Sequence, residues 1–491
     1  MELDRRIFLG ALAGVAATPA LGQPAQPAPA ATTPAKNATP LAARLAAYVD
    51  AAKFADLDAA TIERVKVHLL DSLGCGIGAF KEKTVSAVRE LAFANGGNGA
   101  TVIGTKRRAT LEWAAFANAA AVRADDINDV YVGKGTGHPS DNIAPCLTAA
   151  EAANASGADL LLSIALAYEV NCRFLDAANL DTRGWDHPNY ELISSALAAG
   201  KLMKLSPARL AEAVALALAG HAALLQTRLG DLSNWKGLAG PDAARNAVFA
   251  AQLAQSGITG PGPIFEGEGG FFKQVSGAAD IDPSAFGGRG RPFRIHGCFI
   301  KSYPAQAQTQ TSIPAAAKVA KSVGDLTRIR AIEVKSTHLG WLMAGSMPER
   351  WAPKTSETAD HSLPYIVARS MLDGTITTAS YEPAALSDPK AAALMKLITV
   401  REDASMTALV PKQSPNSVSA TLADGRVVTE RVDDLPGFVS RPMQRSDAEE
   451  KFARNAKAIL PAVQLKRISD AVWALDRADS VRPLLDSLVI A

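Results

Sequence analysis

Cysteine is scarce in this sequence, and charge of neither sign is in excess. The four cysteines in 491 residues show no C-x-x-C spacing, which excludes a zinc ribbon and a locally encoded iron–sulfur site. We interpret Cys75, Cys146, Cys172 and Cys298 as small buried hydrophobic side chains, with a disulfide as the open alternative. The 51 basic and 49 acidic residues give a net charge of +2, which gives no support to binding of nucleic acid or of a membrane surface.

The sequence also lacks the common cofactor and nucleophile motifs. It holds no G-x-G-x-x-G after a predicted strand, no P-loop, no H-E-x-x-H and no G-x-S-x-G. These absences argue against a dinucleotide enzyme, a nucleotide-triphosphate enzyme, a zinc protease and a serine hydrolase. We therefore expect a site built from His, Asp and Lys side chains, without a metal or an organic cofactor.

The N-terminus differs from the rest of the chain. Residues 1–22 contain DRRIFLG followed by an apolar run, which is typical of a twin-arginine export signal. Residues 23–39 are rich in Pro and Ala and predict a linker. No apolar stretch of about 18 residues follows, so we expect no membrane span in a mature chain that is exported or periplasmic. An uncleaved anchor or a chance pair of arginines is the alternative.

The hydrophobic pattern predicts a mainly α fold with a mixed segment. Residues 40–298 read as successive helices, with capping signals such as Ser156 with Asp159 and Ser206-Pro207. Gly74 directly follows the helical spacing of DAATIERVKVHLLDSLG and predicts the end of that helix. Residues 299–445 add β-branched runs and a hairpin around Asp424-Gly425, which predict a smaller α+β domain. Residues 446–491 are helical again and open with a capping-box pattern of Ser446 with Glu449. We expect them to rejoin the first helical domain, so that the α+β domain is an inserted lid.

Acidic residues gather at the predicted end of the helix over TLEWAAFANAAAV. Asp125, Asp126 and Asp129 stand where the helix dipole disfavours negative charge, and Asp126 and Asp129 are spaced to share one face. His138 follows in a glycine-rich loop, and a carboxylate beside an imidazole can orient its ring. The alternative is a solvated acidic loop with a structural His-Pro turn.

Three further side chains stand in unusual surroundings. His187 in WDHPNY directly precedes a predicted helix. There it can serve as a hydrogen-bond donor or acid, and the alternative is a histidine that caps the helix. Lys236 in WKGLAG lies beside a tryptophan and just ahead of a predicted helix, and Lys301 in KSYPAQAQTQ lies in a nearly uncharged segment. A lone lysine of this kind suggests a carboxylate partner or ligand; the alternative for each is a snorkelling surface lysine. In SETADHSLPY, by contrast, we favour helix capping by Ser362 over chemistry at Glu357, Asp360 or His361.

These residue types suit proton transfer next to a carboxylate. Lysines can hold substrate carboxylates and stabilise the charge of an enolate-like intermediate. A base removes the α-proton, and an acid protonates the departing group.

The chain resembles the MmgE/PrpD family over about residues 40–470. The likeness rests on many segments in the same order, namely DSLGCGIGAF, RADDINDVY with GHPSDN, AYEV, WDHPNY, WKGLAG with AARNA, KSYPAQAQTQ and SETADHSLPY. The resemblance implies a large helical domain made from both chain ends, an α+β lid, a site between them and a homodimer. It implies Asp126, His138, His187, Lys236 and Lys301 as the site residues.

The family resemblance also implies an activity. Its members include 2-methylcitrate dehydratase, cis-aconitate decarboxylase and an epimerase. A tyrosine that the decarboxylase carries near the first lid strand falls here on Thr337 or His338, and SETADHSLPY is closer to the dehydratases. We therefore predict a cofactor-independent lyase that dehydrates 2-methylcitrate or a related citrate-like hydroxy acid. The alternatives are a decarboxylase or epimerase on a small polycarboxylate, or an exported carboxylate-binding protein without turnover.

The predicted roles are specific. We expect Lys236 and Lys301 to bind substrate carboxylates. We expect His138, held by Asp126, to transfer a proton, and His187 to act as the second acid/base or as a binding donor.

Overall fold

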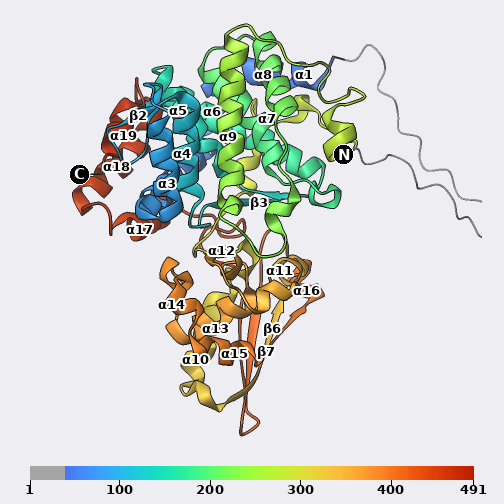
Figure 1. The fold of residues 1–491 in the computed structure, drawn as a ribbon, viewed down its shortest axis with the longest axis vertical. Coiled ribbons are helices and arrows are strands. Elements are labelled where there is room, and N and C mark those ends of the chain that lie inside the picture. The colour runs from blue at the N-terminus through green and yellow to red at the C-terminus, as the bar shows by residue number, and fades with distance from the viewer. Residues whose placement is uncertain (1–38, 491) are drawn as a thin grey trace, which may run out of the picture. The chain divides into compact units, whose positions relative to one another are not determined.

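The computed structural model describes residues 39–490, so the predicted export signal and the linker up to residue 38 lie outside the described residues (Figure 1). The fold is mainly α, as predicted, with small sheets. Residues from Thr39 onward form one compact unit. Within the described part of the chain, no helix is both long and apolar enough to span a bilayer.

Helices dominate the first part of the described chain. In order they are α1 (Leu41–Ala51), α2 (Ala59–Gly78), α3 (Lys83–Ala94), α4 (Leu111–Arg123), α5 (Ile143–Ala152), α6 (Gly157–Ala177), α7 (Pro188–Leu202), α8 (Pro207–Gly220) and α9 (Trp235–Gln255). Short strands lie between them and after them, namely β1 (Ala100–Thr101), β2 (Arg108–Ala109), β3 (Asp129–Val132), β4 (Thr136–Gly137) and β5 (Phe299–Ile300). Alanine-rich α4 and α7 both pack against α9, since small side chains let helix backbones approach (Figure 1).

A mixed segment follows. Its helices are α10 (Ser312–Val323), α11 (His338–Ala344), α12 (Ser356–Ala359), α13 (Leu363–Asp373), α14 (Pro383–Leu386), α15 (Pro389–Met395) and α16 (Ala404–Thr407). Its strands are β6 (Ile329–Ser336), β7 (Ile398–Glu402), β8 (Asn416–Leu422) and β9 (Val427–Val432), in the order β7-β6-β8-β9. Only the β6–β7 pair is parallel, and α10 and α13 pack against the sheet. The predicted hairpin is confirmed, with Gly425 at φ +83° between β8 and β9.

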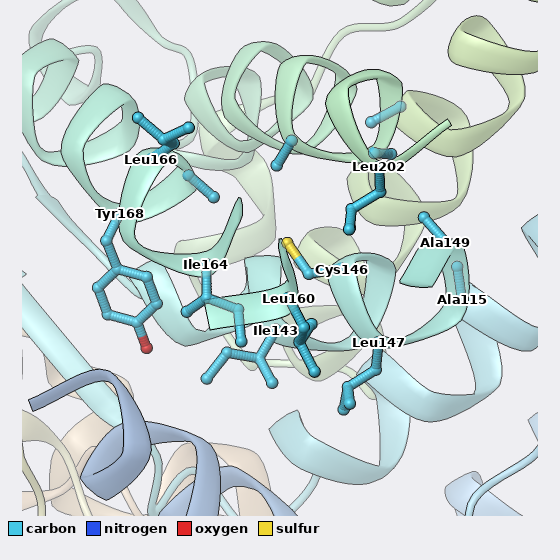
Figure 2. Close-up of a cluster of buried hydrophobic side chains, with 14 of the residues drawn as sticks. Ala115, Ile143, Cys146, Leu147, Ala149, Leu160, Ile164, Leu166, Tyr168 and Leu202 are labelled. Carbon is cyan, nitrogen blue, oxygen red and sulfur yellow. The ribbon is translucent and has the colours of Figure 1, made fainter. Parts of the chain in front are cut away.

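The chain ends in α17 (Arg445–Ala456), α18 (Ala462–Trp473) and α19 (Arg482–Ser487). Helix α17 packs along α2, and one hydrophobic core takes residues from 41–300 and 443–488. Figure 2 shows a part of this core. A second core is formed by residues 305–422. The division at residues 298 and 445, and the role of the middle segment as a lid, stay predictions.

Several predicted helix signals are confirmed, and three are wrong. Ser156 and Ser206 cap α6 and α8 as expected. Helix α2 does not end at Gly74; a Cβ there would lie 3.0 Å from Phe452, so this glycine lets α17 approach. Helix α17 starts with a capping box of Gln444 and Asp447, not at Ser446 with Glu449. Helix α9 starts at Trp235 and continues through Pro241, so Lys236 lies in its first turn and not ahead of it.

The cysteines are buried and unbonded, as predicted. Figure 2 shows Cys146 among leucine, isoleucine and alanine side chains of the first core. The Sγ atoms of Cys172 and Cys298 lie 3.7 Å apart. Burial raises the pKa of all four thiols, which keeps them protonated and unreactive.

Candidate active site

Asp126 is the centre of a buried cluster of cations. It follows α4 in the left-handed conformation, at φ +48°, and is only 2% exposed. Its carboxylate pairs with Arg123, with the Lys301 ammonium at 2.9 Å and with the Lys236 ammonium at 3.5 Å. Burial alone would raise the pKa of Asp126, but these three cations hold it well below its ordinary value. A permanent carboxylate at this point keeps the ammonium groups together.

The two predicted lysines are buried and reach this cluster from distant parts of the chain. Lys301 follows β5, which pairs with β3, and its ammonium also donates to the Asp126 carbonyl oxygen at 2.7 Å. Burial lowers the pKa of Lys301 to about 8. Lys236 lies in the first turn of α9 and donates to Asp360 at 2.7 Å. Neither lysine is therefore a snorkelling surface residue.

Asp360 and His361 belong to the same cluster, which the sequence interpretation missed. The predicted cap is confirmed, because the Ser362 side chain accepts from the backbone N–H of Tyr365. The preceding Asp360, however, accepts from Lys236, and its second oxygen lies 2.5 Å from Nδ1 of His361. Burial and Lys236 lower the pKa of His361 to about 4. The only available signal was an Asp-His pair directly ahead of a cap.

Three of these ligand atoms are also close enough to hold a metal ion. Oxygens of Asp126 and Asp360 and a ring nitrogen of His361 lie within 4.8 Å of one another. Lys236 contacts both carboxylates, and Lys301 contacts Asp126. Since an added divalent cation would face these two ammonium groups at short range, the donor set fits an organic polyanion bound by the lysines better than a metal.

His138 and His187 form the second half of the site. Their rings lie 5.3 Å apart, centroid to centroid. Nδ1 of His138 donates to the Asp129 carbonyl oxygen at 2.7 Å, which leaves Nε2 as the acceptor. Burial, with Arg123 and Lys301 nearby, holds the pKa of His138 well below its ordinary value. At neutral pH this imidazole is therefore unprotonated, and its Nε2 lone pair is available to accept a proton.

His187 occupies the N-cap position of α7, but its side chain makes no capping hydrogen bond. Its Nδ1 donates to Glu191 at 2.7 Å, and its Nε2 accepts from Arg228 at 3.1 Å. Burial lowers the pKa of His187 to about 4. Arg228 also donates to the Lys236 carbonyl oxygen at 2.9 Å, so it joins the histidine half to the lysine half.

The prediction that Asp126 holds His138 is wrong. The chain leaves its helical path after α4, so Asp126 and Asp129 do not share a face. Asp126 faces the cations, whereas the Asp129 carboxylate accepts from the Ser140 N–H at 2.9 Å and the Tyr168 hydroxyl at 2.8 Å. It is the backbone of Asp129 that orients His138. Both aspartates are buried, so the solvated-loop alternative is also wrong.

The structure therefore brings all five predicted residues into one network. Lys236 and Lys301 both contact Asp126 directly, and the ring of His138 lies against that of His187. The sequence interpretation missed Arg123 and Arg228, which no local motif marks. Thr337 instead caps α11 and donates to Gln308, and His338 is exposed and pairs with Glu402, so neither joins the network.

A cavity of about 950 Å³ leads to the lysine half. Its lining includes Arg123, Lys236, Asp360 and Tyr381, together with side chains of α3 and α14. Neither His138 nor His187 is among the lining residues. A polyanion that enters by this cavity therefore meets Lys236 before it reaches the histidines.

Gly240 of α9 lies where the network is most tightly packed. A Cβ at this position would lie 2.2 Å from Oδ2 of Asp141 and 3.0 Å from Oε2 of Glu191. We expect Gly240→Ala to lower the free energy of unfolding by about 1–3 kcal/mol, since buried short side chains must shift. Urea denaturation checks this. The matched control is Gly237→Ala in the same helix, where nothing lies within 4 Å and stability should hold or rise. Equal effects of the two changes would contradict the packing described.

Comparison with known proteins supports a common ancestry. Residues 43–284 match the MmgE/PrpD N-terminal domain, and residues 303–477 match the MmgE/PrpD C-terminal domain. Cis-aconitate decarboxylase of Mus musculus is 28% identical over 81% of this chain and 83% of its own length. The 2-methylcitrate dehydratases of Cupriavidus necator and Salmonella typhimurium are each 28% identical, over 84% of this chain and 88% of their own lengths.

Proposed function

The chain belongs to the MmgE/PrpD family, and from that premise we propose that it is a cofactor-independent lyase. Its proposed reaction is dehydration of 2-methylcitrate or a related citrate-like hydroxy acid. One observation carries the proposal. Two buried ammonium groups, those of Lys236 and Lys301, belong to the same network as two imidazoles whose pKa values are lowered by burial. The named relatives, dehydratases and decarboxylases, are lyases.

The lysines are the proposed carboxylate binders. A substrate carboxylate replaces that of Asp360 on Lys236, and Lys301 remains charged beside Asp126. Removal of the proton next to a bound carboxylate places negative charge on that carboxylate. The two ammonium groups stabilise this charge in a site from which water is largely excluded.

The histidines are the proposed proton carriers. One imidazole takes the proton from carbon through Nε2, and the pair delivers a proton to the departing hydroxyl, which leaves as water. No electrons enter or leave the reaction, so no redox partner is needed. His138 has the more available Nε2, because that of His187 accepts from Arg228.

Two alternatives stand beside this proposal. A decarboxylase or an epimerase would start from the same carbanion, and the decarboxylase and dehydratase relatives are equally similar to this chain at 28% identity. An exported binding protein without turnover is the other class, and the proposed export signal in residues 1–22 gives it some weight.

A substrate panel separates these possibilities. Purified protein is incubated with 2-methylcitrate, citrate, cis-aconitate and small dicarboxylates, and products are followed by mass spectrometry and by the absorbance of a new conjugated C=C. Loss of water supports the dehydratase, and loss of CO₂ the decarboxylase. A compound that raises the melting temperature but is never converted would favour the binding protein and contradict the proposal.

The activity should fall at alkaline pH. The pKa of Lys301 is about 8, so its ammonium is charged below that pH and neutral above it. We expect kcat/KM to decline as pH rises through about 8, because a neutral amine no longer attracts a carboxylate. Glu191 titrates in the same range, with a pKa of about 8, so the profile is repeated with Glu191→Gln. A profile that stays flat to pH 9.5 in both proteins would contradict the role of Lys301.

We also propose that the protein is a homodimer. Large apolar side chains are exposed on and beside α9, namely Leu224, Trp235 and Phe249. Light scattering after size exclusion should give the mass of two chains, and Trp235→Asp with Phe249→Asp should shift it towards one chain. Arg401→Asp, on exposed β7, serves as the control for an added surface acid. A wild-type mass of one chain would contradict the proposal.

A further inference from the structure

Two buried carboxyl groups lie behind His187 and take no part in the chemistry proposed above. Glu191 belongs to α7 and Asp141 to the turn of 3-10 helix at Pro139–Asn142; they are 1% and 2% exposed. One Glu191 oxygen accepts from Nδ1 of His187 at 2.7 Å. The other Glu191 oxygen and both Asp141 oxygens have no hydrogen-bond partner among the described residues. Such orphaned buried oxygens call for an explanation.

The two groups meet at Gly240. Oδ2 of Asp141 and Oε2 of Glu191 both lie within 3.0 Å of the point where a Cβ of residue 240 would be. The nearest cation among the described residues is Arg123, whose Nε lies 3.6 Å from Asp141 and whose Nη1 is already paired with Asp126. The two lysines pair with Asp126 and not with these two carboxyls, so one shared guanidinium is left to balance two further buried negative charges. A proton between the two carboxyls removes one of these charges and gives two of the three orphaned oxygens a hydrogen-bond partner.

We propose that Asp141 and Glu191 share one proton, and that Glu191 is thereby a positioning residue that fixes the tautomer of His187. Glu191 keeps the proton of His187 on Nδ1, so Nε2 faces Arg228 and the reaction site as an acceptor. The titratable and charged groups that face the pair are Arg123, Asp129, Asp186, His187 and Arg228. Burial raises the pKa of Asp141 well above its ordinary value and that of Glu191 to about 8, in agreement with a shared proton.

Infrared spectroscopy tests the shared proton without any substrate. The wild-type protein at neutral pH should give the C=O stretching band of a buried protonated carboxylic acid. Glu191→Gln and Asp141→Asn should each lose that band, because the new amide donates to the remaining carboxylate. The control is Glu151→Gln, which removes a buried carboxylate paired with Arg108 and should leave the band unchanged. Absence of the band in wild type, or its survival in both variants, overturns the proposal.

The pH dependence of stability is a second test. Glu191 holds a proton in the folded chain up to a pH of about 8, whereas in the unfolded chain it loses the proton near its ordinary pKa. Its contribution to stability is thus present at low pH and is lost as pH rises through 8. The urea midpoint of wild type should therefore fall more steeply between pH 5 and 9 than that of Glu191→Gln. Parallel curves would count against the shared proton.

The positioning role rests on the proposed function and has its own readout. Glu191→Gln keeps an acceptor for Nδ1 of His187, so kcat should stay within about tenfold of wild type, whereas Glu191→Leu should lower kcat by about 10–100-fold at unchanged KM. Equal losses in both variants would overturn the positioning role. If no polycarboxylate is converted by wild type, the proposed function fails, while the infrared and stability tests still decide on the shared proton.

Discussion

Lys301→Met is expected to abolish turnover and to lower the free energy of unfolding by about 3–5 kcal/mol. The Lys301 ammonium is 1% exposed and lies 2.9 Å from the Asp126 carboxylate. Methionine fills a similar volume but removes the positive charge, which leaves the buried carboxylate with only Arg123 and the more distant Lys236. The proposed substrate carboxylate loses a binding partner at the same time. Urea denaturation and steady-state kinetics measure the two effects separately.

An exposed lysine supplies the matched control. Lys466 pairs with Asp470 one helical turn away on the surface of α18. Exposed pairs of this kind contribute about 0–1 kcal/mol, so Lys466→Met should change stability little and activity not at all. If Lys301→Met were as harmless as Lys466→Met, the buried charge cluster would not be the centre of the site.

His138→Asn is expected to lower kcat by about 10²–10⁴-fold with little change in stability. The asparagine side-chain amide can still donate to the Asp129 carbonyl oxygen in place of Nδ1, so the local fold is kept. It provides no equivalent of Nε2, and the proton transfer that we assign to this atom is lost. KM should change less than kcat, because carboxylate binding is assigned to the lysines.

His338→Asn is the control for this change. His338 is exposed, and its one acidic partner among the described residues is Glu402. It does not belong to the network that contains His138. Its replacement should leave kcat and KM unchanged. A kcat for His138→Asn within twofold of wild type would remove His138 from the proton transfer and leave His187 as the remaining candidate.

Much of the fold follows from local sequence signals. The caps at Ser156, Ser206 and Ser362 and the Asp424-Gly425 hairpin are decided by interactions within a few residues, so the sequence predicts them. A glycine, by contrast, can either end a helix or allow a close helix contact, and its local sequence does not distinguish the two. Gly74 looks like a helix end but serves a helix contact, because the partner helix α17 lies far away in the chain.

The sequence predicts which five residues form the candidate site, but not which hydrogen-bond and ion-pair partners they have. Asp126, His138, His187, Lys236 and Lys301 stand out because their types or surroundings are unfavourable for an ordinary helix or loop. Their partners do not stand out. Asp360 and His361 directly precede the helix cap Ser362, and that cap is enough to explain the polar residues of this segment. Their contact with Lys236 depends on the fold, because Lys236 lies far away in the sequence. Likewise, the left-handed turn at Asp126 decides which group orients His138, and no spacing rule gives that turn.

Solvent deuterium exchange tests proton abstraction beside a lysine-bound carboxylate most directly. The protein is incubated in D₂O with 2-methylcitrate and its dehydrated product, and both are recovered and weighed by mass spectrometry. Wild type should place deuterium on the carbon next to a carboxylate, and Lys301→Met and His138→Asn should not. Binding of the acids without any deuterium incorporation by the wild-type protein would contradict the account.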